Sequence, residues 1–476
     1  MIRVYCDWNV VSNLKREDWT KIRAFFTANK ETLLCPYSPA HFQDLMKSYT
    51  PNNSYFEQDL NTLEEICGKH LLLWDKDAVK PYFETPKDYF EKEKNAETYD
   101  DFWDLDKLIA FLDEGSNGYG TPKLGQLYKS MLQAMPSGFV DSEHIEEIRK
   151  FFPNYTPGAS MWDMVKDTLP FAKQLTQNRE FYLNYRKQLG EQGLKLDVNS
   201  GNWNEDEVIN NIDTFLKQYS PDLTFMDYVN KSFENRKDPV TRFEFFNSAY
   251  VMLDMIGYKK DKLPKKTDSM QNIQTDAQHA FYGAYCDFFV VGDKNLMSKA
   301  KVLYNLIGIK TKVITPDKFI DTLDEVIHKY PTDITNVLRE GLSFVCKDTV
   351  LYAEPVSEED PTLQYAIKLP KYYLNLFNYA TYTNYEEELG VTMTFDRLFF
   401  NYSTFAFYTE VEAIIDKSIE VFGEDVIGNI DEIRGKFIRG EEAEMRWLFN
   451  GALISLCKFE ERVLPTLTYV ISTKQK

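Results

Sequence analysis

Short apolar runs alternate with amphipathic helical stretches in the first fifty residues, and this alternation restricts the possible folds more than any other feature of the chain. Residues 2–6 (IRVYC) predict a buried strand that stops abruptly at Asp7. Residues 17–29 carry apolar side chains at helical spacing, and residues 33–38 (LLCPYS) predict a second strand. A serine followed by proline then predicts a helix over 39–49. This order is typical of a βαβ unit, which requires a parallel sheet.

The same alternation returns in the second half of the chain. Residues 276–286 predict a helix, and residues 286–291 (CDFFVV) predict a strand. Residues 294–307 predict another helix, which is followed by a strand over 310–315 (KTKVIT). We therefore expect an α/β fold whose parallel sheet is flanked by helices on both faces.

The remaining segments differ in texture and suggest a domain split by an insertion. Residues 1–50 and 238–325 form the two parts of the expected α/β domain. Residues 51–237 are acidic and aromatic, with amphipathic stretches such as WDMVKDTLPFAKQL and almost no β-branched alternation. They predict an all-α insertion.

The last third of the chain, residues 330–476, is predicted to be an α+β module. Strands are expected at segments such as TVLYAEP, TLQYAIKL and LTYVIST. Helices are expected near 404–421 and 441–459. No internal repeat is visible in this module or elsewhere in the chain.

Composition excludes several classes of protein. The chain has 476 residues and a formal charge of −19, so any contact with nucleic acid needs a local basic patch. Its six cysteines form no CxxC pair, and several lie inside apolar runs, as expected of reduced, buried thiols. No stretch approaches the ~20 apolar residues that cross a bilayer. We expect a cytoplasmic protein with no membrane partner.

Aspartates follow the predicted strands at one edge of the sheet. Asp7 ends the first strand, and ligands of open parallel sheets bind beyond the carboxyl ends of strands. Asp276 lies ~16 Å before Asp287 along a helix, and the strand that leads to Asp293 runs back about 20 Å. Asp276 and Asp293 are thus expected to meet, while Asp287 lies at the opposite end and caps a turn. Asp44, about two turns into its helix, faces the same edge as Asp7.

A cluster of carboxylates without arginine predicts a metal site. Such groups repel one another and raise each other's pKa, so a hard divalent cation, Mg²⁺ or Mn²⁺, is the expected occupant. One or two such ions, with a substrate phosphate, activate water for phosphodiester hydrolysis. The alternative is that these aspartates are helix caps and turn formers, which strand-to-helix loops also favour.

The residues at this edge resemble a known family, the PIN-like domain ribonucleases. The resemblance is carried by VYCDWNVVSNL, SPAHFQDL, TDAQHAFYGAYCDFFVVGDKNLMSKA and IKTKVITPDKF, which match the family's four-acid pattern in order and spacing. It implies that the protein binds Mg²⁺ or Mn²⁺ and cleaves RNA endonucleolytically, with Asn9 as polar neighbour of the first acid. The residues that it implies are both catalytic and metal-binding are Asp7, Asp44, Asp276, which would open its helix, and Asp293.

The chain departs from the family pattern at two positions. The second acid is usually glutamate and is here the shorter Asp44. A hydroxyl residue is usual two positions before the last acid, where this chain has Val291. The first change moves a ligand, and the second removes a donor that would orient phosphate or water.

Histidines and lysines near the acids have both structural and functional interpretations. His41 and His279 each lie about one helical turn from a proposed acid, and we interpret them as structural rather than catalytic. Residues 258–318 are locally basic, as a groove that follows a phosphate backbone would be. The proposed phosphate contacts are Lys265, Lys266 and Lys294.

The leading hypothesis is a metal-dependent endoribonuclease whose substrate is RNA. Protein partners would bind through the insertion or the C-terminal module. A second hypothesis is an inactive PIN-like scaffold that binds partners without cleaving RNA. A third is a structure-specific DNA nuclease acting on single-stranded DNA, because related acidic sites act on DNA. Substrate preference distinguishes them.

Overall fold

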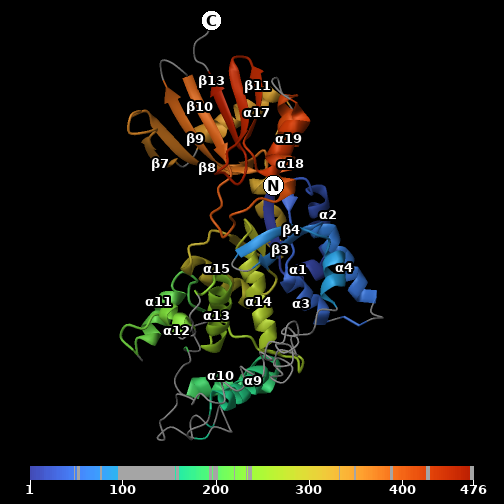
Figure 1. The fold of residues 1–476 in the computed structure, drawn as a ribbon, viewed down its shortest axis with the longest axis vertical. Coiled ribbons are helices and arrows are strands. Elements are labelled where there is room, and N and C mark those ends of the chain that lie inside the picture. The colour runs from blue at the N-terminus through green and yellow to red at the C-terminus, as the bar shows by residue number, and fades with distance from the viewer. Residues whose placement is uncertain are drawn as a thin grey trace, which may run out of the picture. The chain divides into compact units, whose positions relative to one another are not determined.

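We describe the protein from a computed structural model (Figure 1). The described residues are 1–94, 149, 156, 160–191, 196 and 202–471, without 48, 51–53, 76–77, 219, 232, 234–238, 332, 348–349, 386–389 and 425–428. Within the predicted insertion, most residues between 95 and 159 therefore lie outside the described part of the chain. The chain divides into two compact units, and each is described by itself. The first consists of Met1–Lys87, Lys237–Phe246 and Gln278–Lys476, and the second of Asp88–Arg236 and Asn247–Ala277.

A four-stranded parallel sheet forms the centre of the first unit. Its strands run in the order β2 (Leu33–Leu34), β1 (Ile2–Cys6), β5 (Phe288–Val290) and β6 (Lys312–Ile314). All three pairings are parallel, with Cys6 opposite Val290. The α/β prediction is confirmed, and β1 lies inside the sheet, where all five of its residues are buried.

Helices flank this sheet. In chain order they include α1 (Trp8–Asn13), α2 (Thr20–Ala28), α3 (Pro39–Lys47), α14 (Met270–Gly283), α15 (Lys294–Leu306) and α16 (Phe319–Val326). The ring of Tyr5 on β1 contacts His41 of α3 and His279 of α14, so these helices cover the same face. A Cβ on Gly283, at the end of α14, would lie 2.8 Å from the ring of Phe289. Helix α14 therefore packs on β5 at a distance that only glycine allows.

The prediction of an all-α insertion over residues 51–237 is wrong. After α4 (Ser54–Cys67), strands β3 (His70–Asp75) and β4 (Ala78–Phe83) form an antiparallel hairpin, followed by α5 (Pro86–Glu93). The hairpin is held to the first part of the domain, since the Tyr37 amide donates to the His70 carbonyl at 2.9 Å. Each strand has only six residues, and β4 contains Pro81. The alternation of apolar and polar residues is therefore too weak to predict this hairpin from the sequence.

The second unit is helical over its described residues. It contains α9 (Met161–Gln177), α10 (Arg179–Glu191), α11 (Val208–Leu216), α12 (Phe225–Lys231) and most of α13 (Arg242–Met255). Asp254 is fully buried and accepts hydrogen bonds from the Tyr182 hydroxyl at 2.6 Å and from Arg186 at 2.8 Å. This carboxylate ties α10 to α13 within the unit.

The C-terminal module is an antiparallel sheet covered by helices. Its seven strands run in the order β11 (Ala443–Phe449), β12 (Ala452–Lys458), β13 (Thr466–Ile471), β10 (Gly390–Asp396), β9 (Phe377–Tyr385), β8 (Leu363–Tyr373) and β7 (Val350–Pro355). The helices α17 (Ile334–Lys347), α18 (Tyr408–Phe422) and α19 (Ile430–Arg439) lie beside this sheet (Figure 1). Their buried side chains share one core with the strands. The α+β expectation is confirmed for this module.

The helix predicted near 441–459 is wrong, because this segment is the β11–β12 hairpin. Met445 and Trp447 alternate with exposed residues, which is a strand period. The turn is Asn450–Gly451, with φ of 46° and 80°. Asn-Gly between alternating apolar residues is the strongest short hairpin signal, because both turn positions require positive φ.

A buried ion pair joins the central strand to the C-terminal module. The Arg3 guanidinium donates to both Glu410 oxygens, at 2.8 and 2.6 Å, and neither side chain is exposed. It also donates to the Ser403 hydroxyl and lies 4.5 Å from the ring centroid of Phe399. The module is therefore part of the same packed unit as the parallel sheet.

Free thiols are found at Cys6, Cys35, Cys67, Cys286 and Cys457. The first four are buried, as the sequence predicts, and Cys457 is partly exposed. The sulfur atoms of Cys35 and Cys67 lie 3.9 Å apart. Separately, we find among the described helices none whose length and apolar character would allow it to span a membrane.

Candidate active site

Asp7 is held between the carboxyl ends of the two inner strands of the parallel sheet. It directly follows β1 and caps α1, accepting a hydrogen bond from the Val10 amide at 2.8 Å. Its second carboxylate oxygen accepts from the Gly292 amide, in the loop after β5, at 3.2 Å. Its own amide donates to the Val290 carbonyl. These bonds fix Asp7 at the sheet edge where it was predicted.

Burial controls the charge of Asp7. The residue is 1% exposed, and loss of solvent raises the pKa of its carboxyl from 3.8 to about 6. The negative charge of Asp44 raises this pKa further. The Val10 amide and the charge of His279 oppose the increase without cancelling it. Burial is therefore the main reason why the pKa of Asp7 is raised, and the charge of Asp44 contributes least among these causes.

Asp44, on α3, is paired on both oxygens. It accepts from His279 Nε2 on α14 at 3.0 Å and from Lys47 Nζ at 2.5 Å. Burial raises the pKa of Asp44, but the hydrogen bond from His279 and the charges nearby outweigh burial and lower it below its usual value. Asp44 is thus an ionised, oriented carboxylate.

A buried polar network stands behind Asp44. The Tyr5 hydroxyl lies 2.6 Å from Ser38 Oγ and 3.0 Å from His279 Nδ1. His41 Nε2 lies 3.0 Å from the Cys6 carbonyl oxygen, and burial lowers the pKa of His41 to about 3, which keeps it neutral. His41 is thus bonded to the backbone within the fold, and its structural role stays a prediction. His279 also contacts Asp44, a link that the sequence does not indicate.

Asp293 directly follows Gly292, whose amide donates to Asp7. It caps α15, with one oxygen accepting from the Asn295 and Leu296 amides at 2.6 and 2.9 Å. Its other oxygen, Oδ2, accepts no hydrogen bond from the described part of the chain. Lys294 follows and is exposed.

Asn9 lies near the same loop. A Cβ built on Gly292 would be 3.9 Å from the Cβ of Asn9. The Asn9 carbonyl accepts from the Asn13 side chain at 2.7 Å, and Asn9 itself is exposed. Asn9 therefore lies beside the loop that follows β5, and its role as polar neighbour of the first acid stays a prediction.

Asp276 does not open its helix, contrary to the prediction. Helix α14 begins at Met270, because the Ser269 hydroxyl accepts from the Gln271 amide and caps it. Asp276 lies inside the helix, three residues before His279, and belongs to the second unit. Lys265 and Lys266 also belong to the second unit. The membership of these three residues in the site stays a prediction.

The comparisons with known proteins add nothing to what these residues indicate about function. No family model, curated protein or solved structure matches the chain.

The donor set fits a hard cation bound mainly by water and substrate. Within the part of the chain that the structure describes, no three Asp, Glu, His or Cys side chains converge closely enough to hold a metal by themselves. Each carboxylate has about four acceptor positions, and each oxygen of Asp7 uses one. Mg²⁺ commonly takes one or two carboxylates and completes its shell with water and phosphate oxygens. Asp7 and Asp293 each keep acceptor positions that such a cation could use.

Proposed function

We propose that this protein is a PIN-like, Mg²⁺- or Mn²⁺-dependent endoribonuclease that acts at the carboxyl edge of its parallel sheet. The observation that carries the proposal is the buried carboxylate of Asp7, whose two oxygens bind the starts of the segments that follow β1 and β5. A buried acid with a raised pKa at the carboxyl edge of a parallel sheet is typical of a functional site.

The cation would be held by Asp7 and Asp293, with Asp44 nearby. When bound, it supplies an activated water and stabilises the leaving oxygen of the phosphodiester. The chain supplies the arrangement of acids: the Gly292 amide fixes Asp7, and His279 fixes the orientation of Asp44. The exposed Lys294, beside Asp293, would contact the substrate phosphate.

RNA is proposed as substrate because the four acid-bearing segments resemble PIN-like ribonucleases. The charge of −19 disfavours nonspecific binding to nucleic acid, so substrate binding needs a local positive charge such as that of Lys294. Single-stranded DNA is the competing substrate, and direct comparison of the two decides between them.

Replacing Asp293 by asparagine tests the proposal. We expect RNA cleavage in Mn²⁺ to fall at least about 100-fold, since the change removes a cation ligand. The melting temperature should change little, because asparagine caps helices as well as aspartate does. The measurement is cleavage of labelled single-stranded RNA, hairpin RNA and single-stranded DNA in Mg²⁺, in Mn²⁺ and in EDTA.

Asp333→Asn is the matched control. Asp333 is exposed and caps α17 of the C-terminal module, its oxygen accepting from the Asn336 amide at 3.0 Å. This variant loses the same charge at the same kind of position and should cleave RNA normally. Equal activity of the two variants, or cleavage that persists in EDTA, would refute the proposal.

Replacing His279 by alanine separates a positioning role from a structural one. We expect the cation concentration for half-maximal cleavage to rise about 10- to 100-fold, since Asp44 loses its orienting donor. His328→Ala is the control, because His328 is also buried and its Nε2 lies 2.8 Å from the Glu340 carboxylate. If both variants lose stability but neither shifts the cation requirement, His279 is structural only.

A further inference from the structure

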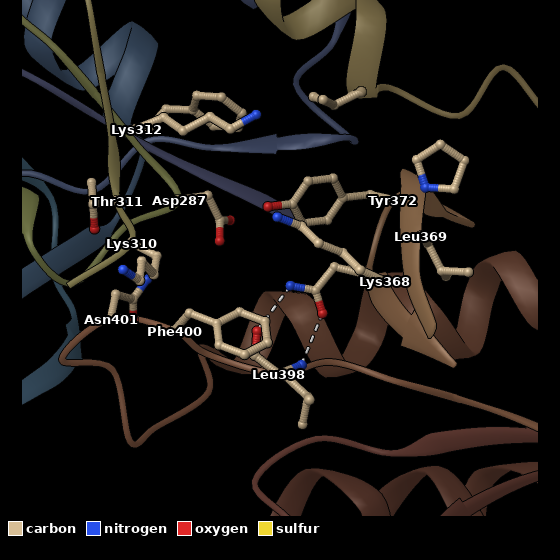
Figure 2. A pocket seen from close by; sticks show the side chains of 14 residues that line it. Asp287, Lys310, Thr311, Lys312, Lys368, Leu369, Tyr372, Leu398, Phe400 and Asn401 are labelled. Carbon is tan, nitrogen blue, oxygen red and sulfur yellow. Dashed lines mark hydrogen bonds between the residues drawn. The ribbon is translucent and has the colours of Figure 1, made fainter. Parts of the chain in front are cut away.

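A cavity opens at the edge of the parallel sheet opposite Asp7. Its volume is about 290 Å³, and it lies between the residues that precede β5 and β6 and strand β8 of the C-terminal module (Figure 2). The register between β8 and β9 shifts between Lys368 and Tyr373, which bends β8 beside the cavity. All of its lining residues belong to the first unit.

Three lysines line this cavity from two different segments. Lys310 and Lys312 flank the buried Thr311 just before and at the start of β6, and Lys368 comes from β8. All three are exposed, and no described carboxylate lies within ion-pair distance of their ammonium groups. Figure 2 shows Lys310 and Lys368 on the same cavity as Asp287. Lys312 Nζ also lies 5.8 Å from the ring centroid of Phe288. Three positive charges that line one cavity favour the binding of an anion.

The acid in the cavity does not neutralise these lysines. Asp287 accepts from Arg397 on both oxygens at 2.6 Å and from the Arg3 amide at 2.8 Å. The Arg397 side chain is fully buried, and its charge balances that of Asp287. Asp287 therefore lies at the end of the sheet where it was predicted, although it pairs with Arg397 rather than capping a turn. The net charge lining the cavity remains positive.

Aromatic rings complete the wall. Phe400 is 43% exposed, although it is a large apolar side chain, and its ring faces the cavity (Figure 2). Tyr372 lines the cavity as well, and the Arg397 guanidinium lies 5.0 Å from its ring centroid. The amide of Asn378 is already bonded to the backbone of Leu398, at 2.9 Å in both directions. The lining thus leaves two features for a ligand to contact. The lysines can bind an anionic group, and Phe400 can bind a flat apolar one.

We propose that this cavity binds a nucleotide through its phosphate monoester, which the three lysines hold while the base lies against Phe400. The cavity volume of about 290 Å³ lies at the lower end of the roughly 300 to 1,000 Å³ found for ligand pockets, which limits the ligand to one nucleotide. Base stacking on an aromatic ring tolerates every base. The nucleotide is either free in solution or the phosphorylated end of an RNA strand.

This cavity is separate from the proposed cleavage site. Asp287 precedes β5 and Asp293 follows it, and six residues of extended chain span about 20 Å. Binding can therefore be measured without divalent cations, under conditions in which the proposed nuclease is inactive. Failure of either proposal leaves the other unaffected.

The test is calorimetric titration of the full chain in EDTA. The titrants are AMP, UMP, adenosine, inorganic phosphate, and a short RNA with or without a 5′-phosphate. Lys310→Gln/Lys368→Gln removes two of the phosphate donors, and Phe400→Leu removes the ring. The matched control is Lys21→Gln/Lys30→Gln, which removes two exposed lysines from elsewhere in the first unit.

We expect AMP and UMP to bind and adenosine not to bind. The double variant at Lys310 and Lys368 should weaken binding about tenfold or more, whereas the control variant should not. Phe400→Leu should weaken AMP but leave inorganic phosphate unchanged. Binding of the 5′-phosphorylated RNA alone would support the site and identify its source as an RNA end. The proposal fails if no phosphorylated titrant binds, if the two double variants bind equally, or if phosphate binds as tightly as AMP.

Discussion

Asp7→Asn should abolish RNA cleavage and, at neutral pH, make the protein more stable. The loss of cleavage should be at least about 100-fold, because the residue is the central proposed cation ligand. The gain in stability follows from burial, since the fold holds a carboxylate where a neutral group is favoured. Most substitutions of buried residues lower stability, so a variant that loses activity and gains stability is distinctive.

The sign of the stability effect follows from linkage. The pKa of Asp7 is raised from 3.8 to about 6, so the folded chain holds this proton more tightly than the unfolded chain. Its contribution to stability is complete below pH 3.8 and is lost as pH rises through about 6. The difference corresponds to about 3 kcal/mol at pH 7. Asparagine keeps one acceptor for Val10 but loses the one for Gly292, so we expect a net gain of about 1–2 kcal/mol.

Chemical denaturation from pH 4 to pH 8 measures this effect. The wild-type protein should lose stability relative to Asp7→Asn across that interval, while Asp333→Asn should follow the wild type. If Asp7→Asn is less stable than the wild type at pH 7 and as stable at pH 4, the carboxylate stabilises the fold and our account of the site is wrong.

Glu410→Gln should cost the fold about 3–5 kcal/mol, because it leaves the charge of Arg3 buried without a partner. Replacing both residues by methionine should recover most of this loss, since an apolar pair of similar volume needs no solvation. Denaturation of the single and double variants measures the coupling between them. Glu441→Gln is the control, since its partner Arg439 is exposed and such surface pairs contribute little.

The ion pair also predicts a dependence on pH of its own. Burial raises the pKa of Glu410, but the charge and hydrogen bonds of Arg3 outweigh burial and lower it from 4.5 to about 2. Its contribution is therefore complete above pH 4.5 and is lost as pH falls towards 2. The wild type should lose stability in this interval more steeply than the double methionine variant. Parallel curves for the two proteins would contradict the assignment.

The sequence predicts elements whose signals are local. The runs that become β1 and β5 are short, apolar and followed by acids, and simple counting places Asp7 and Asp293 at the same edge. The β11–β12 hairpin was also predictable, because Asn450–Gly451 specifies its turn. Its apolar residues are dense enough to be mistaken for a helix, and this explains the error.

The remaining features depend on contacts between distant residues. The Arg3–Glu410 pair joins residues 407 positions apart, and an arginine inside an apolar strand gives no indication of its partner. The link from His279 to Asp44 crosses 235 positions. A histidine close to an acid in the sequence is a weak signal for contact between the two, because the partner of His279 is Asp44 on another helix.

The central position of β1 sets the order in which this protein can be made. Its neighbour β5 pairs with it through residues 284 positions later in the chain, as the Arg3 amide and Asp287 show. A ribosome that adds roughly 5–20 residues per second needs about 15–60 s to cover that interval. During this time an apolar strand waits without its main partner, so we expect the nascent chain to require a chaperone. The two loops that hold Asp7 meet only after β5 has emerged, so a chain that ends before β5 lacks the contact between Gly292 and Asp7.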